Sequence, residues 1–203
     1  MLLFWLSGCE QDSTPGYEIH DTKYQALGDD GQPLENDDLN GTCVLDQYTG
    51  LMWQVKSETS GLNDWRNTYS WYNPEESSGP ELDYRGTANG GICSGSDCDT
   101  WDYVKAINQI GLCGYSDWRM PSRDALASIS DIRKLQSPPT INKKYFPYTQ
   151  ADEYWSGNDY DFQWDSAWTW NYKYGHDRVD WKASAKYLRL VRGKALKLER
   201  VED

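Results

Sequence analysis

Aromatic, amide and carboxylate side chains gather in two late segments of the chain, residues 157–165 and 174–182. Flat aromatic faces can stack on the C–H faces of sugars, and Asp and Asn oxygens accept hydrogen bonds from hydroxyls. Tyr and Trp also suit protein recognition, because they lose little rotamer entropy on binding. For any single residue an ordinary polar loop between strands is the simpler interpretation, so the prediction of a ligand-binding surface rests on the cluster. Its candidate residues are Asn158, Asp159, Tyr160, Asp161, Trp164, Asp165, Tyr174, His176, Asp180 and Trp181.

Residues that could form a catalytic site are sparse. The chain has two histidines, His20 and His176, and a His-centred triad would have to use the second. Neither a Gly-x-Ser-x-Gly nucleophile turn nor a phosphate-binding Gly-x-x-x-x-Gly-Lys sequence is present. Pairs of carboxylates for glycoside hydrolysis exist, but nothing selects one pair. The sequence therefore favours a protein that is not an enzyme.

Three alternating aspartates, Asp159, Asp161 and Asp165, resemble part of a calcium-binding loop. An EF-hand requires glycine at its sixth position and glutamate at its twelfth, where this chain has Trp164 and Trp170. Calcium held by carboxylates and loop carbonyls stays open as an alternative, and the sequence indicates no other metal or cofactor.

Four cysteines form an even set, with Cys9 left over. Four cysteines allow three pairings. We favour Cys93–Cys98, which would close a tight loop, together with Cys43–Cys113. A zinc site is the competing interpretation, but it requires closer pairs or histidines. Disulfides would place the folded part outside the cytosol.

The N-terminus resembles a bacterial lipoprotein. Residues 1–8 are apolar, although the run is short and no Lys or Arg precedes it, and residues 6–9 fit a lipobox. We interpret residues 1–8 as a remnant of a signal peptide, Cys9 as the lipidated residue, and residues 9–39 as an acidic flexible tether. This predicts a lipid-anchored protein of the bacterial cell envelope, at the outer membrane or in the periplasm.

The composition excludes some partners. The 203-residue chain has a formal net charge of -12, which argues against binding nucleic acid because like charge repels phosphate. No stretch approaches the ~20 apolar residues of a membrane span, so contact with the membrane is expected through the lipid anchor only. The chain has 11 Trp and 15 Tyr against 3 Phe. Trp and Tyr combine apolar area with a polar tip, which suits either a recognition surface or a Trp-rich core.

The elements that would position these residues include two helices joined by residues 111–122. Asp99 or Thr100 can cap the first helix and Gly111 can end it. Pro121 keeps the preceding residue extended, and Ser122 can cap the second. The apolar repeats that predict the helices are Tyr103, Val104, Ile107 and Ile110, then Leu126, Ile129 and Ile132.

The remaining pattern predicts antiparallel sheet. A first hairpin is expected from residues 43–45 and 51–55, a long irregular excursion over 57–98, and a closing strand over 187–192. In the segment 167–174, Trp168, Trp170 and Tyr172 alternate onto one face, which we expect to point inward. Residues assigned to the scaffold are Trp53, Trp118, Arg119, Pro121, Trp155, Trp168, Trp170 and Arg192, with Arg119 needing a carboxylate or carbonyls as partners.

Several short motifs resemble one family when taken together. The central one is CGYSDWRMPS at residues 113–122, although the Glu-Leu usual after it is Ala-Leu here. The others are Thr49–Trp53, Cys98–Thr100, Tyr145–Pro147, Tyr154–Ser156, Ala167–Trp168 and Leu190–Gly193. Residues 40–194 thus resemble the Lcl C-terminal domain family, named for the end of a bacterial collagen-like adhesin, and residues 195–203 follow as a basic tail.

The resemblance implies an α+β, C-type lectin-like fold, in which two helices pack on antiparallel sheet and ligands bind at late loops. It favours a surface lipoprotein with an adhesin-like domain that recognises a glycan or a protein on another surface. One alternative is an enzyme distantly related to formylglycine-generating oxidases, but those use a late cysteine pair and this chain has no cysteine after Cys113. Another alternative is a structural subunit of an envelope assembly.

Overall fold

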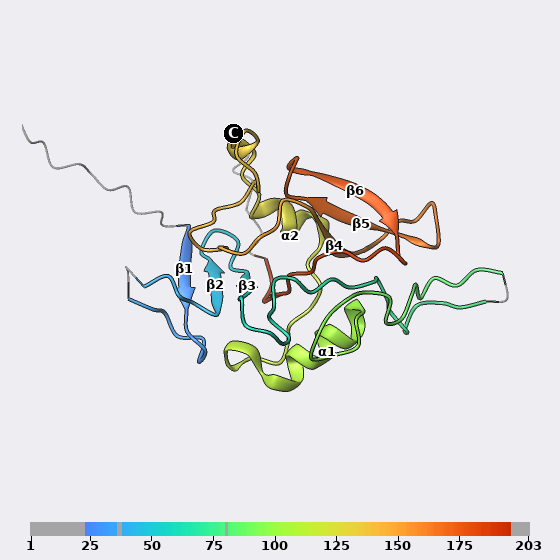
Figure 1. Ribbon diagram of the computed structural model, residues 1–203, viewed down its shortest axis with the longest axis horizontal. Coiled ribbons are helices and arrows are strands. Elements are labelled where there is room, and N and C mark those ends of the chain that lie inside the picture. The colour runs from blue at the N-terminus through green and yellow to red at the C-terminus, as the bar shows by residue number, and fades with distance from the viewer. Residues whose placement is uncertain (1–22, 36–37, 80, 196–203) are drawn as a thin grey trace, which may run out of the picture.

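A computed structural model describes residues 23–35, 38–79 and 81–195 of the chain. It shows an α+β fold with two antiparallel sheets, of strand order β1-β2-β3-β7 and β4-β5-β6 (Figure 1). The predicted lipidation residue Cys9, the signal-peptide remnant and residues 196–203 lie outside the described part. None of the helices within that part has the length and apolar character needed to cross a membrane.

The first sheet contains the predicted hairpin. Strand β2 (Cys43–Asp46) pairs with β3 (Met52–Gln54), and β3 pairs with the short closing strand β7 (Val191–Arg192). Strand β1 (Tyr24–Leu27) adds to the other edge of β2. The folded part therefore begins earlier than residue 40, and the prediction of a flexible tether up to residue 39 is wrong for this segment. The acidic composition hid a four-residue strand that is anchored by the buried side chains of Tyr24, Ala26 and Leu27.

The second sheet consists of β4 (Glu153–Asp159), β5 (Ser166–Asn171) and β6 (His176–Trp181), with an irregularity between Trp155 and Asp159. The segment 174–182, expected to be a loop, is therefore mostly a strand. The β4–β5 turn at 160–165 and the β5–β6 turn at 172–175 lie at opposite ends of this sheet, because consecutive strands run antiparallel.

The expected inward face of β5 needs a correction. Trp168 and Trp170 share a face, as the alternation predicts, but both are only half-buried. The residues between them, Thr169 and Asn171, are buried, at 0% and 5% exposure. The reason is that both faces of β5 pack against core residues. On the Trp168 side, Trp170 packs against the core cluster that contains the buried Tyr154 and Tyr172, so the inward prediction holds for Tyr172. On the other side, Trp155 and Ala167 belong to a second core cluster.

The two predicted helices are present. Helix α1 (Thr100–Ile110) begins at Asp99, whose carboxylate accepts the amide of Asp102, and ends at Gly111, whose φ of 67° favours glycine. A 3-10 turn (Leu112–Gly114) follows it. Ser122 caps α2 (Arg123–Ser128). This helix is shorter than its apolar repeat predicts, and Ile132, in the 3-10 turn Ile132–Lys134, is 64% exposed.

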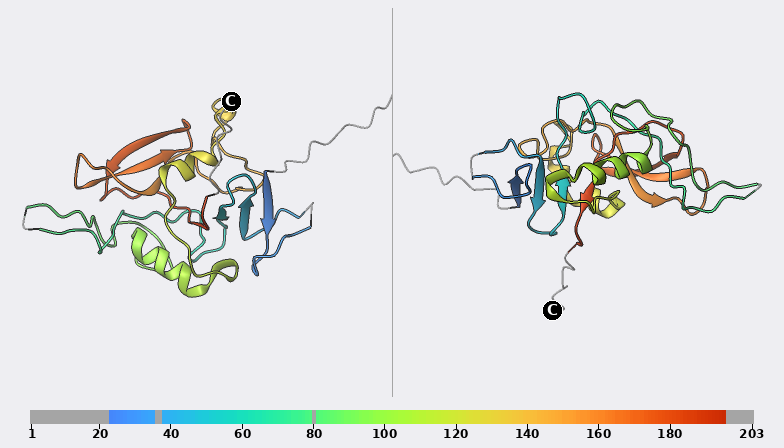
Figure 2. Two further views of the ribbon diagram at one scale, coloured as in Figure 1. Left: turned by 180° about the vertical axis from the view of Figure 1, so that it is seen from behind. Right: turned by 90° about the horizontal axis from the view of Figure 1, so that it is seen from below.

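The two sheets lie toward opposite ends of the long axis, with α2 between them and α1 along one side (Figures 1 and 2). The excursion 57–98 has no named strand and extends beyond the second sheet as an arm. Both predicted disulfides are confirmed: Cys93–Cys98 pins the end of the excursion, and Cys43–Cys113 joins β2 to the segment after α1.

The segment after α1 is held by its own side chains. Trp118 is 2% exposed and donates its indole N–H to the Leu112 carbonyl over 3.0 Å. Arg119 donates to the carbonyls of Met120 and Gly193, the kind of partner its sequence context required. The guanidinium of Arg192 binds Asp117, and its carbon lies 3.5 Å from the centre of the Tyr115 ring.

Candidate functional site

A polar pocket of about 320 Å³ opens between the start of α2 and the end of β4. It brings together three of the predicted ligand-binding residues, Asn158, Asp159 and Asp161, because all three lie at the end of β4 or in the turn that follows it. Helix α2 supplies the opposite wall. The residues that line the pocket are Ser122, Arg123, Asp124, Gly157, Asn158, Asp159, Asp161 and Trp168.

Arg123 organises one side of this pocket. Its backbone amide donates to the Asn158 side-chain oxygen over 2.8 Å, which fixes α2 against β4. Its guanidinium lies 3.1 Å from Asp177 and 4.5 Å from the centre of the Trp168 ring. The ring of Tyr160 packs nearly perpendicular to the same indole, with ring centres 5.3 Å apart. Because Trp168 is covered by these two neighbours, the pocket offers hydrogen-bonding groups more than an open aromatic face.

Lys182 organises the other side. This lysine is 1% exposed, and its ammonium lies 2.5 Å from both Asp159 Oδ1 and the Tyr84 carbonyl oxygen. The ammonium also lies 4.2 Å from the centre of the Trp71 ring. The buried ammonium of Lys182 therefore balances the charge of Asp159. The exposed Asp161 has no hydrogen bond or ion pair with any residue in the described part of the chain.

A second pocket, the apolar pocket, adjoins the first at Gly157, which lines both. Its volume is about 280 Å³. It lies between the start of α1, the excursion and the segment after Trp118. The residues that line it are Trp71, Tyr72, Asn73, Thr100, Trp101, Val104, Arg119, Met120 and Gly157.

The other predicted ligand-binding residues are not gathered at this site. Tyr174 and His176 stack on each other, with ring centres 6.0 Å apart, at the opposite end of the second sheet. Asp165 lies at the end of the β4–β5 turn, where its backbone carbonyl accepts the amide of Lys182. The predicted ligand-binding residues therefore do not form one surface, because β6 spreads them from one end of the second sheet to the other.

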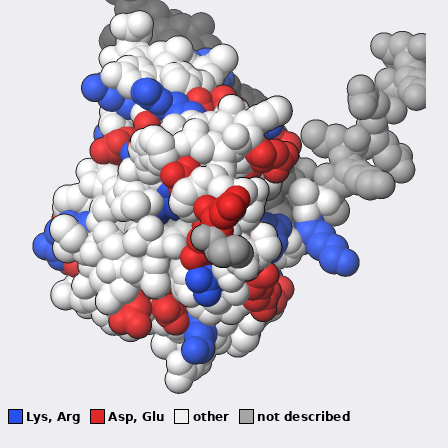
Figure 3. Space-filling view, turned by 90° about the vertical axis from the view of Figure 1, so that its right-hand side faces the viewer, with Lys and Arg blue, Asp and Glu red and all other residues white. Residues whose placement is uncertain are grey.

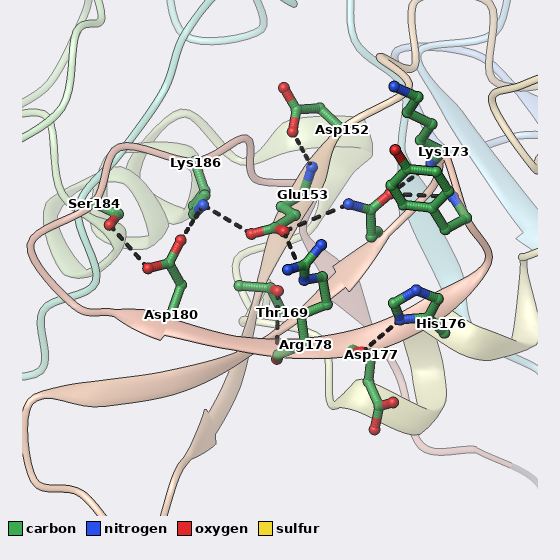
Figure 4. A network of polar contacts seen from close by, with 12 residues as sticks. Asp152, Glu153, Thr169, Lys173, His176, Asp177, Arg178, Asp180, Ser184 and Lys186 are labelled. Carbon is green, nitrogen blue, oxygen red and sulfur yellow. Dashed lines mark hydrogen bonds and ion pairs between the residues drawn. The ribbon is translucent and has the colours of Figure 1, made fainter.

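Asp180 belongs to a network of charges on the face of the sheet opposite Trp168 (Figure 4). It pairs with Lys186, which also lies 2.8 Å from the largely buried Glu153. Burial alone would lower the pKa of Lys186, but its bonds to Asp180 and Glu153 raise that pKa above its ordinary value. Arg178 approaches Glu153 to 3.4 Å. Asp180 thus has partners within the protein, which favours a structural role.

Exposed aromatics gather around the β4–β5 turn. Trp164 is 37% exposed and Trp181, which pairs with Ser166 in the sheet, is 55% exposed. Phe162, which the sequence reasoning did not select, is 88% exposed. The end of the molecule where this turn and the arm lie shows acidic and basic side chains interspersed over a larger uncharged surface (Figure 3).

Among the described residues, no group of three or more His, Cys, Asp or Glu side chains is placed to hold a metal ion. Of the aspartates considered for calcium, Asp159 binds Lys182 and Asp165 accepts a hydrogen bond from the Gln163 side chain.

Sequence reasoning missed Arg123, Asp124 and Lys182. The first two directly follow the predicted cap Ser122, but the sequence gives no sign that the start of α2 meets Asn158, 35 positions later. Lys182 lies in the predicted segment 174–182, but nothing in the neighbouring sequence indicates that its side chain is buried.

Neither the search of curated proteins nor that of solved structures gave a match. The family model of the Lcl C-terminal domain matches residues 42–192, which include both disulfides, both helices and the polar pocket. The chain therefore belongs to the Lcl C-terminal domain family.

Proposed function

We propose that this protein is a lipid-anchored, adhesin-like binding protein of a bacterial cell envelope, which recognises a neutral glycan in the polar pocket and performs no catalysis. Membership in the Lcl C-terminal domain family supports a surface domain of adhesin type. A C-type lectin-like fold and the anchor at Cys9 are parts of the proposal that rest on the sequence.

One observation favours a glycan: hydrogen-bond acceptors converge in the polar pocket while its cations are engaged. Arg123 binds Asp177 and also lies 3.9 Å from Asp124, and Lys182 binds Asp159. The carboxylates of Asp124 and Asp161 are exposed to solvent. Carboxylates accept only, so they suit the hydroxyl donors of a sugar. The same carboxylates repel sulfate and carboxylate groups, which favours an uncharged glycan over an acidic one.

A glycan array tests this proposal. The domain from residue 23 to residue 195 is applied with and without calcium, beside a variant with Asp161→Ala. Binding to neutral glycans that is lost in the variant would support the proposal. Binding restricted to sulfated glycans, or unchanged in the variant, would contradict it.

A further inference from the structure

We propose that the apolar pocket is a second subsite, which takes a short alkyl or aryl group attached to the sugar held in the polar pocket. The ligand class is then an amphiphilic glycoconjugate. This inference rests on the proposed function and deepens it.

The walls of the apolar pocket are rings and aliphatic chains. Trp71, Tyr72 and Trp101 provide the rings, and Val104 and Met120 provide the aliphatic side chains. Val104 belongs to the apolar face of α1, so the pocket continues the core to the surface. Removing an alkyl group from water into such a pocket is favourable, by about 0.8 kcal/mol for each buried CH₂ group.

Most polar groups of the apolar pocket already have partners. The Thr100 hydroxyl donates to the Tyr72 carbonyl and accepts the Tyr72 amide, both over 2.9 Å. The Trp71 indole N–H donates to the Ser156 carbonyl over 3.0 Å. Arg119 is engaged by two carbonyls. A sugar hydroxyl placed here would find few free partners, so an apolar occupant fits better.

The two pockets adjoin at Gly157. It lines both of them, and its amide donates to the Pro121 carbonyl over 2.8 Å. A Cβ at this position would lie 3.0 Å from the Met120 Cβ, so β4 passes close to Met120 here without a side chain of its own. The two pockets therefore meet where β4 contacts residues 120 and 121, and a ligand that occupies both pockets passes over this contact.

Lys182 lies behind both pockets. Its ammonium binds Asp159, which lines the polar pocket, and lies over the ring of Trp71, which lines the apolar pocket. Lys182 thus fixes the position of Asp159 in the polar pocket relative to Trp71 in the apolar pocket, as a ligand that spans both pockets requires.

The test compares methyl and butyl β-glycosides of glucose, galactose and N-acetylglucosamine by calorimetry, with 1-butanol as the purely apolar probe. We expect the butyl glycoside of at least one sugar to bind about tenfold more tightly than its methyl glycoside. Val104→Asn should remove this difference while leaving the affinity for the methyl glycoside unchanged. Lys105→Asn, on the exposed side of the same helix, is the matched control.

Equal affinities for methyl and butyl glycosides would overturn this inference and leave the proposed function intact. Butyl glycosides that bind no better than butanol, with no effect of Asp161→Ala, would overturn both. A Val104→Asn variant that keeps the butyl preference would also overturn the inference, and its melting temperature shows whether the fold is retained.

Discussion

The ammonium of Lys182 lies 2.5 Å from Asp159 Oδ1 and 4.2 Å from the centre of the Trp71 ring. One buried cation therefore connects strand β4 with the excursion, two segments about which the sequence gives quite different signals. The apolar pocket exists only when both segments are folded, because Gly157 of β4 and residues 71–73 of the excursion both line it.

Lys182→Met should destabilise the protein by about 1–3 kcal/mol, because it leaves the Asp159 oxygen and the Tyr84 carbonyl without their donor. Chemical denaturation measures this free energy. In the double variant Lys182→Met/Asp159→Asn the two losses should be less than additive, since the second change removes the charge left unpaired by the first. Strict additivity would show that the pair is not coupled.

Lys56 should make stability depend on pH. Its ammonium is buried, donates to the Tyr103 phenol over 2.7 Å and lies near Tyr69. Burial, and then the positive charge of Arg189, lower the pKa of Lys56 well below its usual 10.5. The unfolded chain therefore binds a proton at pH values where the folded chain has lost it, and stability should fall as pH falls through this range.

Lys56→Met should flatten this dependence. Over the pH range just below 10.5, the usual pKa of lysine, the wild-type free energy of unfolding should rise with pH by up to about 1.4 kcal/mol per unit, and that of the variant less. Burial raises the pKa of tyrosines such as Tyr103, so these residues lower the stability of the protein only at still higher pH. Equal slopes for the two proteins, measured in urea, would refute this account of Lys56.

The two disulfides should contribute unequally. Cys43–Cys113 spans 70 residues and Cys93–Cys98 spans 5. By loop-closure entropy, replacing both cysteines by alanine should cost about 4 kcal/mol for the long bridge and about 2 kcal/mol for the short one. Denaturation of the two variants gives the comparison, and a larger loss from the short bridge would contradict it.

Cys9→Ser should release the protein from the membrane if Cys9 carries the lipid. The expected result is loss of incorporated labelled fatty acid and a shift from the membrane fraction to the soluble fraction. The reason is that the polar chain would have no lipid to hold it at the membrane. Cys93→Ser serves as a control that changes a cysteine elsewhere. A Cys9→Ser protein that stays in the membrane fraction would rule out the lipid anchor.

Short-range signals predicted the elements that depend on a few neighbouring residues. The cap at Asp99 and the end at Gly111 defined α1, and the turn at 48–50 defined the first hairpin. The cysteine pairing followed from loop size and hairpin position. The cap, the helix end and the turn required no knowledge of distant contacts, whereas the Cys43–Cys113 bridge joins residues 70 positions apart.

Long-range packing decided what the sequence could not predict. Alternation placed Trp168 and Trp170 on one face, but not which face is buried, because both faces of the second sheet are covered. Strand β1 depends on pairing with β2, which its acidic neighbours do not reveal. The polar pocket joins Arg123 to Asn158 across 35 positions, so only the folded chain shows that they meet.

The central claim is that the polar pocket binds the ligand. It is tested most directly by calorimetry with the neutral glycan that gives the strongest array signal, on Asp161→Ala and on Asp97→Ala, which changes an exposed aspartate outside the pocket. The account predicts that Asp161→Ala weakens binding about tenfold or more, as loss of a charged hydrogen-bond acceptor does, with an unchanged melting temperature. Equal affinities for the two variants and the wild type would contradict it.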